Sequence, residues 1–248
     1  MKIFTMPVPK EADMPSDRKV VFNLRDNDPF YTEMVRGFRA KVEHRIDATG
    51  LRALGLTSAV AGEGKTKTAI HLAVNMASTG RKKVLLMDLD LRKSDIAREM
   101  RIDAGPGLSE YLSGAVSREE IIRNTSIRGL FLVPAGKSVH SPVDMLAGEK
   151  LRSFLKELRG HFDLLILDTP PILPVPDAIT ISEQLDAFIL VFRLSFTPYK
   201  LLQQAVDELG TGKIMGVVLN GDEKKSDKYY SRYYGNYYKP SHIEQQKS

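Results

Sequence analysis

The sequence contains no cysteine. This absence excludes disulfide bonds, thiolate zinc sites and cysteine-ligated iron–sulfur clusters, and it is compatible with a reducing cytoplasm. Long apolar runs are missing too: the longest, AFILVF at 187–192, is far shorter than the ~20 residues that a membrane-spanning helix needs. The first residues carry prolines and acids where a signal peptide would have an apolar core. We therefore expect a soluble, cytoplasmic protein.

A strong charge of one sign is also absent. The 36 Lys and Arg against 31 Asp and Glu give a net charge of +5 and a pI of about 9.2. This balance favours a solvated surface with surplus lysine over a nucleic-acid footprint, so we expect no nucleic acid among the partners. A weak attraction to an anionic membrane surface stays open.

The motif SAVAGEGKT, at 58–66, is the feature around which the chain is organised. It follows an apolar run and precedes residues whose apolar positions recur at helical spacing, which predicts a strand, a glycine turn and a helix. Two glycines let consecutive N–H groups point at one anion, and the helix start adds its dipole. Lys65 would reach the β- and γ-phosphates of a nucleotide, and Thr66 would bind Mg²⁺. The residues predicted to contact the nucleotide are Ala61, Gly62, Glu63, Gly64, Lys65, Thr66 and Lys67.

Aspartates follow two further apolar runs. VLLM ends in Asp88 and Asp90, and LLIL ends in Asp168 before Thr169-Pro170. Ligands of open parallel sheets bind at the carboxyl ends of the strands, so these carboxylates should meet the phosphates and the metal. Close carboxylates are costly to ionise without a cation, and Mg²⁺ supplies one. The predicted metal ligands are Thr66, Asp88, Asp90 and Asp168.

Strand and helix patterns alternate along most of the chain. This predicts an α/β fold in which a parallel sheet has helices on both faces, as in P-loop NTPases. We expect an irregular arm at 1–27, one domain at 28–220 and a polar tail at 221–248. A single long amphipathic helix is expected at 141–160. Asn220, which ends the last apolar run, is either a contact to the nucleotide base or an ordinary turn residue.

Asp28-Pro29 predicts the start of a helix at 28–47. This helix carries Glu33, Arg36 and Arg39 at steps of three, on adjacent turns of one face. These residues alone favour a solvated face whose ion pairs contribute little to the stability of the helix.

The tail holds six of the nine tyrosines of the chain among charged and polar residues, with almost no aliphatic side chains. This composition predicts a flexible segment. Its tyrosines could stack on single-stranded nucleic acid, form a contact surface or accept phosphate. They are Tyr229, Tyr230, Tyr233, Tyr234, Tyr237 and Tyr238.

The combination of AGEGKT, VLLMDLDLR, LLILDTPP and the terminal tyrosines resembles the bacterial tyrosine kinases of the CpsD/CapB type, which regulate capsule and exopolysaccharide production. The resemblance runs from about residue 28 to the end of the chain. It implies a protein-tyrosine autokinase that uses ATP and Mg²⁺ and phosphorylates its own tail tyrosines in trans. It also implies that Lys65, Asp88, Asp90 and Asp168 are catalytic, with Asp88 as the base.

The resemblance further assigns Glu33, Arg36 and Arg39 to the E-x-x-R-x-x-R helix that joins subunits in a ring. It implies a separate membrane adaptor of the chain-length-determinant type, which would hold the protein at the inner face of the plasma membrane. A protein-tyrosine phosphatase and other phosphorylated proteins are further expected partners. The family usually has proline where Ala61 stands, so nucleotide affinity should differ without being lost.

Two alternatives use the same fold. A switch ATPase of the MinD/ParA kind would have a second lysine five residues before Lys65, where this chain has Val60. A nucleotide-dependent adaptor of polysaccharide export would use the tyrosines as a binding surface. A contact from Arg92 to phosphate and a surface role for this residue both stay open.

Overall fold

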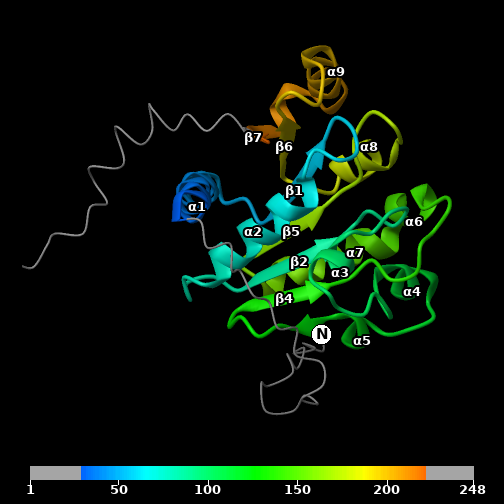
Figure 1. Ribbon diagram of the computed structural model, residues 1–248. Coiled ribbons are helices and arrows are strands. Elements are labelled where there is room, and N and C mark those ends of the chain that lie inside the picture. The colour runs from blue at the N-terminus through cyan, green and yellow to red at the C-terminus, as the bar shows by residue number, and fades with distance from the viewer. Residues whose placement is uncertain (1–28, 222–248) are drawn as a thin grey trace, which may run out of the picture.

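In a computed structural model of the chain, residues 29–221 are described, and they form a three-layer α/β fold around one mostly parallel sheet (Figure 1). The sheet has seven strands in the order β3-β4-β2-β5-β1-β6-β7. Only β3 is antiparallel to its neighbour. The strands are β1 (Ala53–Ser58), β2 (Val84–Asp88), β3 (Arg123–Asn124), β4 (Leu130–Val133), β5 (Leu164–Asp168), β6 (Ala187–Arg193) and β7 (Ile214–Asn220). The predicted fold class is confirmed.

Helices cover both faces of the sheet, because each central strand is apolar on both sides. In β2, Leu85 and Met87 belong to one core, while Val84 and Leu86 belong to the other. Helices α1 (Pro29–Thr49), α2 (Lys65–Ala77) and α3 (Ile96–Glu99) pack on the second of these cores. The first core is covered by α4 (Leu108–Ser113), α5 (Arg118–Ile121), α6 (Val143–Ala147), α7 (Glu149–His161), α8 (Asp177–Ser182) and α9 (Tyr199–Leu209).

The prediction of a single helix at 141–160 is wrong, because two helices, α6 and α7, occupy this segment. They meet at Gly148, whose backbone is extended with φ −68° and ψ 154°. A Cβ at Gly148 would lie 3.1 Å from the carbonyl oxygen of Asp144, so the chain approaches itself closely at this bend. The amphipathic pattern continues across the glycine, and for this reason the pattern does not reveal the break.

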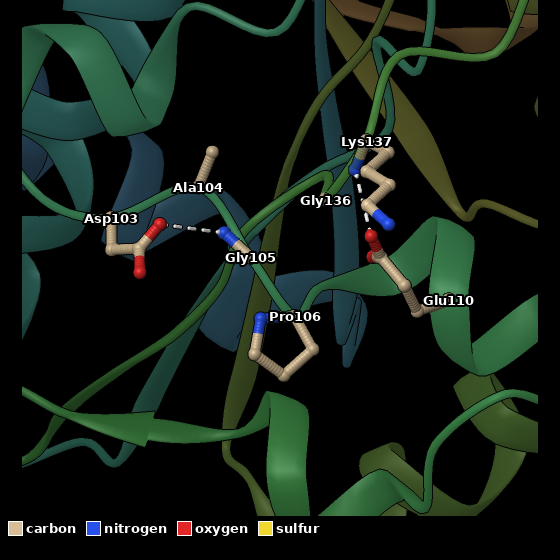
Figure 2. Close-up of a pocket in the computed structure, with 7 residues that line it drawn as sticks. All are labelled: Asp103, Ala104, Gly105, Pro106, Glu110, Gly136 and Lys137. Carbon is tan, nitrogen blue, oxygen red and sulfur yellow. Dashed lines mark hydrogen bonds between the residues drawn. The ribbon is translucent and has the colours of Figure 1, made fainter.

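The loops that follow α3 and β4 surround a hollow beside the carboxyl edge of the sheet (Figure 2). Glu110 lies at its wall and accepts hydrogen bonds from the N–H groups of Gly107 (2.9 Å) and Lys137 (3.1 Å). None of the residues predicted for the nucleotide site lines this hollow.

Candidate active site

The predicted nucleotide loop connects the end of β1 to the start of α2. Gly62 and Gly64 have φ angles of 88° and 93°, which L side chains rarely adopt. A Cβ at Gly64 would also clash with the side chain of Asn220. The loop can therefore take this shape only with glycine at these positions, and it directs the N-terminus of α2 at the space where a phosphate would bind.

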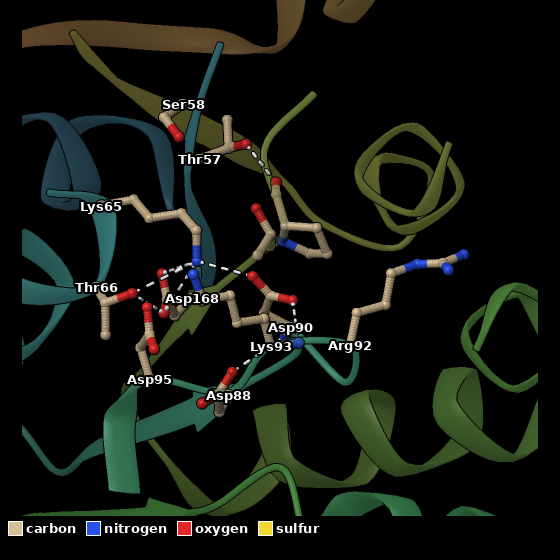
Figure 3. A network of polar contacts seen from close by, with 12 residues as sticks. Thr57, Ser58, Lys65, Thr66, Asp88, Asp90, Arg92, Lys93, Asp95 and Asp168 are labelled. Carbon is tan, nitrogen blue, oxygen red and sulfur yellow. Dashed lines mark hydrogen bonds and ion pairs between the residues drawn. The ribbon is translucent and has the colours of Figure 1, made fainter. Parts of the chain in front are cut away.

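Lys65, the first residue of α2, is buried between two acids (Figure 3). Its Nζ lies 3.1 Å from Oδ2 of Asp90 and 3.4 Å from Oδ1 of Asp168. Burial by itself lowers the pKa of Lys65, but the charges of Asp168, Asp90 and Asp88 raise it more, so this pKa lies above its ordinary value. Lys65 is therefore a fixed positive charge at the start of the helix.

The carboxylates of Asp88 and Asp168 come together because β2 and β5 are neighbouring parallel strands, with these residues as register partners. Both side chains are fully buried. Burial raises the pKa of Asp88, and the nearby charge of Asp168 raises it further. The pKa of Asp168 is raised mainly by burial as well, although Lys65 and the Thr66 hydroxyl oppose this. Asp88, Asp90 and Asp168 therefore all act on the charge of Lys65.

Backbone N–H groups hold the Asp88 side chain. Its Oδ1 accepts a hydrogen bond from the N–H of Asp90 at 3.0 Å, and its Oδ2 accepts one from the N–H of Ile96 at 3.3 Å. The loop after β2 is therefore folded around this carboxylate, which fixes the orientation of its side chain.

The donor set fits a metal ion that shares its ligands with a phosphate. Among residues 29–221, no group of three or more His, Cys, Asp or Glu side chains is arranged as a metal cluster. Mg²⁺ needs only one or two carboxylates when water and phosphate oxygens supply the rest. Oγ1 of Thr66 and Oδ2 of Asp168 lie 2.6 Å apart. Such an ion would also offset the excess negative charge around Lys65.

Glu63 belongs to the loop, but its side chain points away from Lys65 into the protein. It is fully buried, and its carboxylate accepts hydrogen bonds from the N–H of Val60 (2.8 Å), the N–H of Arg193 (3.3 Å) and the hydroxyl of Thr197 (2.6 Å). The side chain thus fastens the nucleotide loop to the segment between β6 and α9. The sequence gives no signal for Thr197, which lies 134 residues from Glu63.

Asn220 also fastens the loop. Its Nδ2 donates to the carbonyl oxygen of Glu63 at 2.8 Å, and its Oδ1 accepts from the N–H of Gly221 at 2.9 Å. The side chain lies beside the loop, and its amide group is bonded to protein in this structure. The contact to the nucleotide base stays a prediction. Lys67 has an exposed side chain, with its Nζ 3.9 Å from Glu99, so only its backbone belongs to the start of α2.

Arg92 joins three segments of the carboxyl edge. Its guanidinium makes two hydrogen bonds to the fully buried carboxylate of Asp177, at 2.6 and 3.1 Å. It also donates to the carbonyl oxygen of His140 at 2.6 Å, and its own carbonyl accepts from the Ser138 hydroxyl. In this structure Arg92 therefore anchors the loop that follows Asp88 and carries Asp90, and sequence reasoning missed its partner Asp177.

The three residues predicted for subunit contacts differ in their surroundings. Glu33 and Arg36 form an ion pair of 3.6 Å at the surface of α1. Arg39 is mostly buried and pairs with Glu43 of its own helix at 2.7 Å, and Glu43 also pairs with Arg81. The six tail tyrosines and the arm at 1–27 lie outside the described residues.

Comparison with known proteins agrees with these features. A family model described as an AAA domain matches residues 54–201. Tyrosine-protein kinase YwqD of Bacillus subtilis is 31% identical over 82% of this chain and 86% of YwqD. Tyrosine-protein kinase CpsD of Streptococcus pneumoniae is 37% identical over 75% of this chain and 82% of CpsD. The solved kinase domain of Escherichia coli ETK has a TM-score of 0.72 at 30% identity, covering 77% of this chain and 75% of that domain.

The glycine loop, Lys65 and the strand-end aspartates define a nucleotide-binding protein of the P-loop class. Within this class, the chain belongs to the family of bacterial tyrosine-protein kinases. It spans 86% of YwqD but only 29% of the tyrosine-protein kinase ptk of Acinetobacter johnsonii. The MinD protein of Pyrococcus horikoshii, solved with Mg-ADP, shares the fold at 21% identity and a TM-score of 0.56.

None of the helices in the described part of the chain is long and apolar enough to cross a membrane. This agrees with the short apolar runs of the sequence.

Proposed function

We propose that this chain is an ATP-dependent protein-tyrosine kinase that phosphorylates its own C-terminal tyrosine cluster in trans. The observation that best supports this is the ammonium of Lys65, held between Asp90 and Asp168 at the end of a glycine loop. This geometry supplies both a cradle for the transferred phosphate and carboxylates next to it. The kinases among its relatives provide the reaction class.

In the proposed reaction, Lys65 and the amides of 61–67 neutralise the phosphate oxygens of ATP. Bound Mg²⁺ would supply further charge neutralisation, and Thr66, Asp88, Asp90 and Asp168 would hold it. Asp88 takes the proton of the tyrosine hydroxyl while the new O–P bond forms and the bond between the γ-phosphorus and the leaving oxygen of ADP breaks. A phenol with an ordinary pKa of about 10 needs such a base at neutral pH. Positioning and charge neutralisation supply most of the acceleration.

The same proposal includes regulation of capsule or exopolysaccharide production, with phosphoproteins and a phosphatase as partners. The exposed pair Glu33–Arg36 is available for contacts between subunits in a ring. Arg39 would have to exchange its bond with Glu43 for one with a neighbouring subunit. A membrane adaptor would hold the kinase at the inner face of the plasma membrane and support its activation.

The test is to incubate the protein with Mg²⁺ and ATP, with and without the cytoplasmic peptide of a candidate adaptor, and to measure phosphotyrosine. A variant with all six tail tyrosines changed to phenylalanine should lose most of the signal and keep nucleotide binding. Sedimentation of an Arg36→Ala variant checks the ring, because an unchanged mass would count against it.

A switch ATPase is the second candidate, because the fold is shared with MinD. Its signature would be ATP hydrolysis without phosphotyrosine under either condition. That result would replace the kinase proposal.

A further inference from the structure

Phe196 is a large aromatic side chain that lies against the nucleotide loop and is 51% exposed. It belongs to the segment between β6 and α9. A Cβ placed on Gly62 would be 3.4 Å from Cζ of the Phe196 ring, so the ring lies close beside the loop. An exposed ring is common on protein surfaces, but one that borders a nucleotide loop offers a flat apolar face where a ligand can reach it.

The ring is held in place by its neighbours. The guanidinium of Arg193 lies 5.0 Å from the ring centroid, within the range of a cation–π contact. Arg193 also reaches the carbonyl oxygen of Gly62 at 3.4 Å. Ser195, the residue before Phe196, has a φ of 56°, a conformation that a non-glycine residue adopts only when its surroundings impose it.

Glu63 holds both ends of the segment that contains Ser195. Its carboxylate accepts from the N–H of Arg193 and from the hydroxyl of Thr197, the residues that flank the strained turn. The N–H of Thr197 also closes the turn onto the carbonyl oxygen of Arg193 at 3.1 Å. Phe196 is therefore positioned by the same side chain that braces the nucleotide loop.

The order of the strands distinguishes two sides of the site along the carboxyl edge of the sheet. Lys65, Asp90 and Asp168 gather where β2 and β5 end, on one side of β1. These charges mark the end that takes the terminal phosphates. Strands β6 and β7 lie on the other side of β1, where Phe196 follows β6 and Asn220 ends β7. A nucleotide whose terminal phosphate lies at Lys65 and that extends along this edge toward β6 would have its nucleoside on the side of Phe196.

We propose that Phe196, supported by Arg193, is the platform on which the base of the bound nucleotide stacks. The proposal rests on nucleotide binding at the loop, but not on tyrosine as the phosphate acceptor. Every nucleobase has a π face, so the ring contributes affinity for the base without selecting adenine over guanine. Loss of one such stack is expected to weaken binding about 5- to 50-fold.

Isothermal titration of the full chain, in the presence of Mg²⁺, with ADP, GDP and tripolyphosphate separates the base from the phosphates. Phe196→Ala should weaken ADP and GDP about 5- to 50-fold and leave tripolyphosphate unchanged, and Phe196→Trp should retain the wild-type affinity. Tyr199→Ala is the matched control, because Tyr199 is 71% exposed at the start of α9 and begins the next helix instead of contacting the loop. Thermal melts check that each variant is folded.

Unchanged ADP affinity in Phe196→Ala would overturn the proposal and leave the kinase function intact. Equal losses for ADP and tripolyphosphate would also overturn it, because the ring would then act only on the shape of the loop. So would an equal loss in Tyr199→Ala, which would indicate a general surface effect. A wild-type chain that binds neither ADP nor tripolyphosphate would contradict the proposed function as well.

Discussion

The hydroxyl of Thr66 donates a hydrogen bond of 2.6 Å to Oδ2 of Asp168, which joins the first turn of α2 to the end of β5. The two residues are 102 positions apart, and the parallel sheet brings them together. A hydroxyl has one donor and two acceptor lone pairs, so Thr66 can keep this bond while its oxygen also binds a cation. Two of the four predicted metal ligands therefore lie in direct contact.

Replacement of Lys65 by methionine should reduce autophosphorylation by at least about 100-fold, because a positioned cation next to the transferred phosphate is removed. The change also leaves Asp88, Asp90 and Asp168 without their cation, so thermal stability without nucleotide should fall at neutral pH. Phosphotyrosine blots and thermal melts measure the two effects. Lys156→Met, at an exposed position on α7, is the control, and an equal loss there would contradict the role of Lys65.

Removal of Arg92 should destabilise the fold, because the fully buried carboxylate of Asp177 then loses its ion-pair partner. We expect Arg92→Ala to lower the free energy of unfolding by about 2–3 kcal/mol, less than for a fully buried pair, since Arg92 is itself partly exposed. Urea denaturation measures the change.

Arg152→Ala is the matched control, because its ion pair with Glu149 is exposed and should contribute less than about 0.5 kcal/mol. The double change Arg92→Ala with Asp177→Asn should recover part of the loss, since no buried charge is then left unpaired. Equal losses for Arg92→Ala and Arg152→Ala would refute the anchoring role of Arg92.

Glu63→Gln should weaken nucleotide binding and stability together. The carboxylate accepts three hydrogen bonds, and an amide would present its own N–H₂ to one of these donors. The expected cost is about 1–3 kcal/mol in the free energy of unfolding. Thr197→Val should reproduce part of this effect, whereas Thr180→Val removes only an exposed hydrogen bond to the carbonyl oxygen of Pro176, just before α8, and serves as the control. Unchanged ADP affinity in Glu63→Gln would contradict the role of Glu63 in holding the nucleotide loop.

Glu110 should make stability depend on pH. Burial raises the pKa of this carboxyl, but the N–H groups of Gly107 and Lys137 and the Ser109 hydroxyl lower it more, so the pKa lies below its ordinary value. A depressed pKa contributes stability that is present above the unfolded value of about 4.3 and is lost as the pH falls through the folded value. The melting temperature of Glu110→Gln should therefore fall most below wild type at pH 7, and the gap should narrow below pH 4.5.

The control variant is Glu183→Gln, because Glu183 is exposed. Its melting temperature, measured over the same pH range, provides the baseline. A gap between Glu110→Gln and wild type that widens toward acid would show that the hydrogen bonds around Glu110 do not favour its charged form.

The features of the site that sequence could predict are those that lie at the end of an apolar run. Lys65, Asp88, Asp90 and Asp168 each belong to a local pattern, and the rule that parallel strands end at one edge brings them together. The contacts of Arg92 with Asp177 and of Glu63 with Thr197 could not be predicted, because they join loops 85 and 134 residues apart and need the order of the strands. Family membership and fold class are confirmed, whereas the roles of α1 and of the tail stay predictions.

Strand β7 ends at Asn220, in register with Arg193, so the polypeptide leaves the sheet at the edge that carries the nucleotide loop. Tyr229 and Tyr238 follow Asn220 by nine and eighteen residues. An extended chain spans at most ~3.6 Å per residue, which limits these tyrosines to within about 30 and 65 Å of the strand end. Groups joined by so short a connection meet at effective concentrations in the millimolar range. In the proposed trans reaction, a ring that holds the subunits together would supply this short connection between the tail of one subunit and the active site of its neighbour. The catalytic edge would then need little affinity of its own for the sequence around the tyrosines.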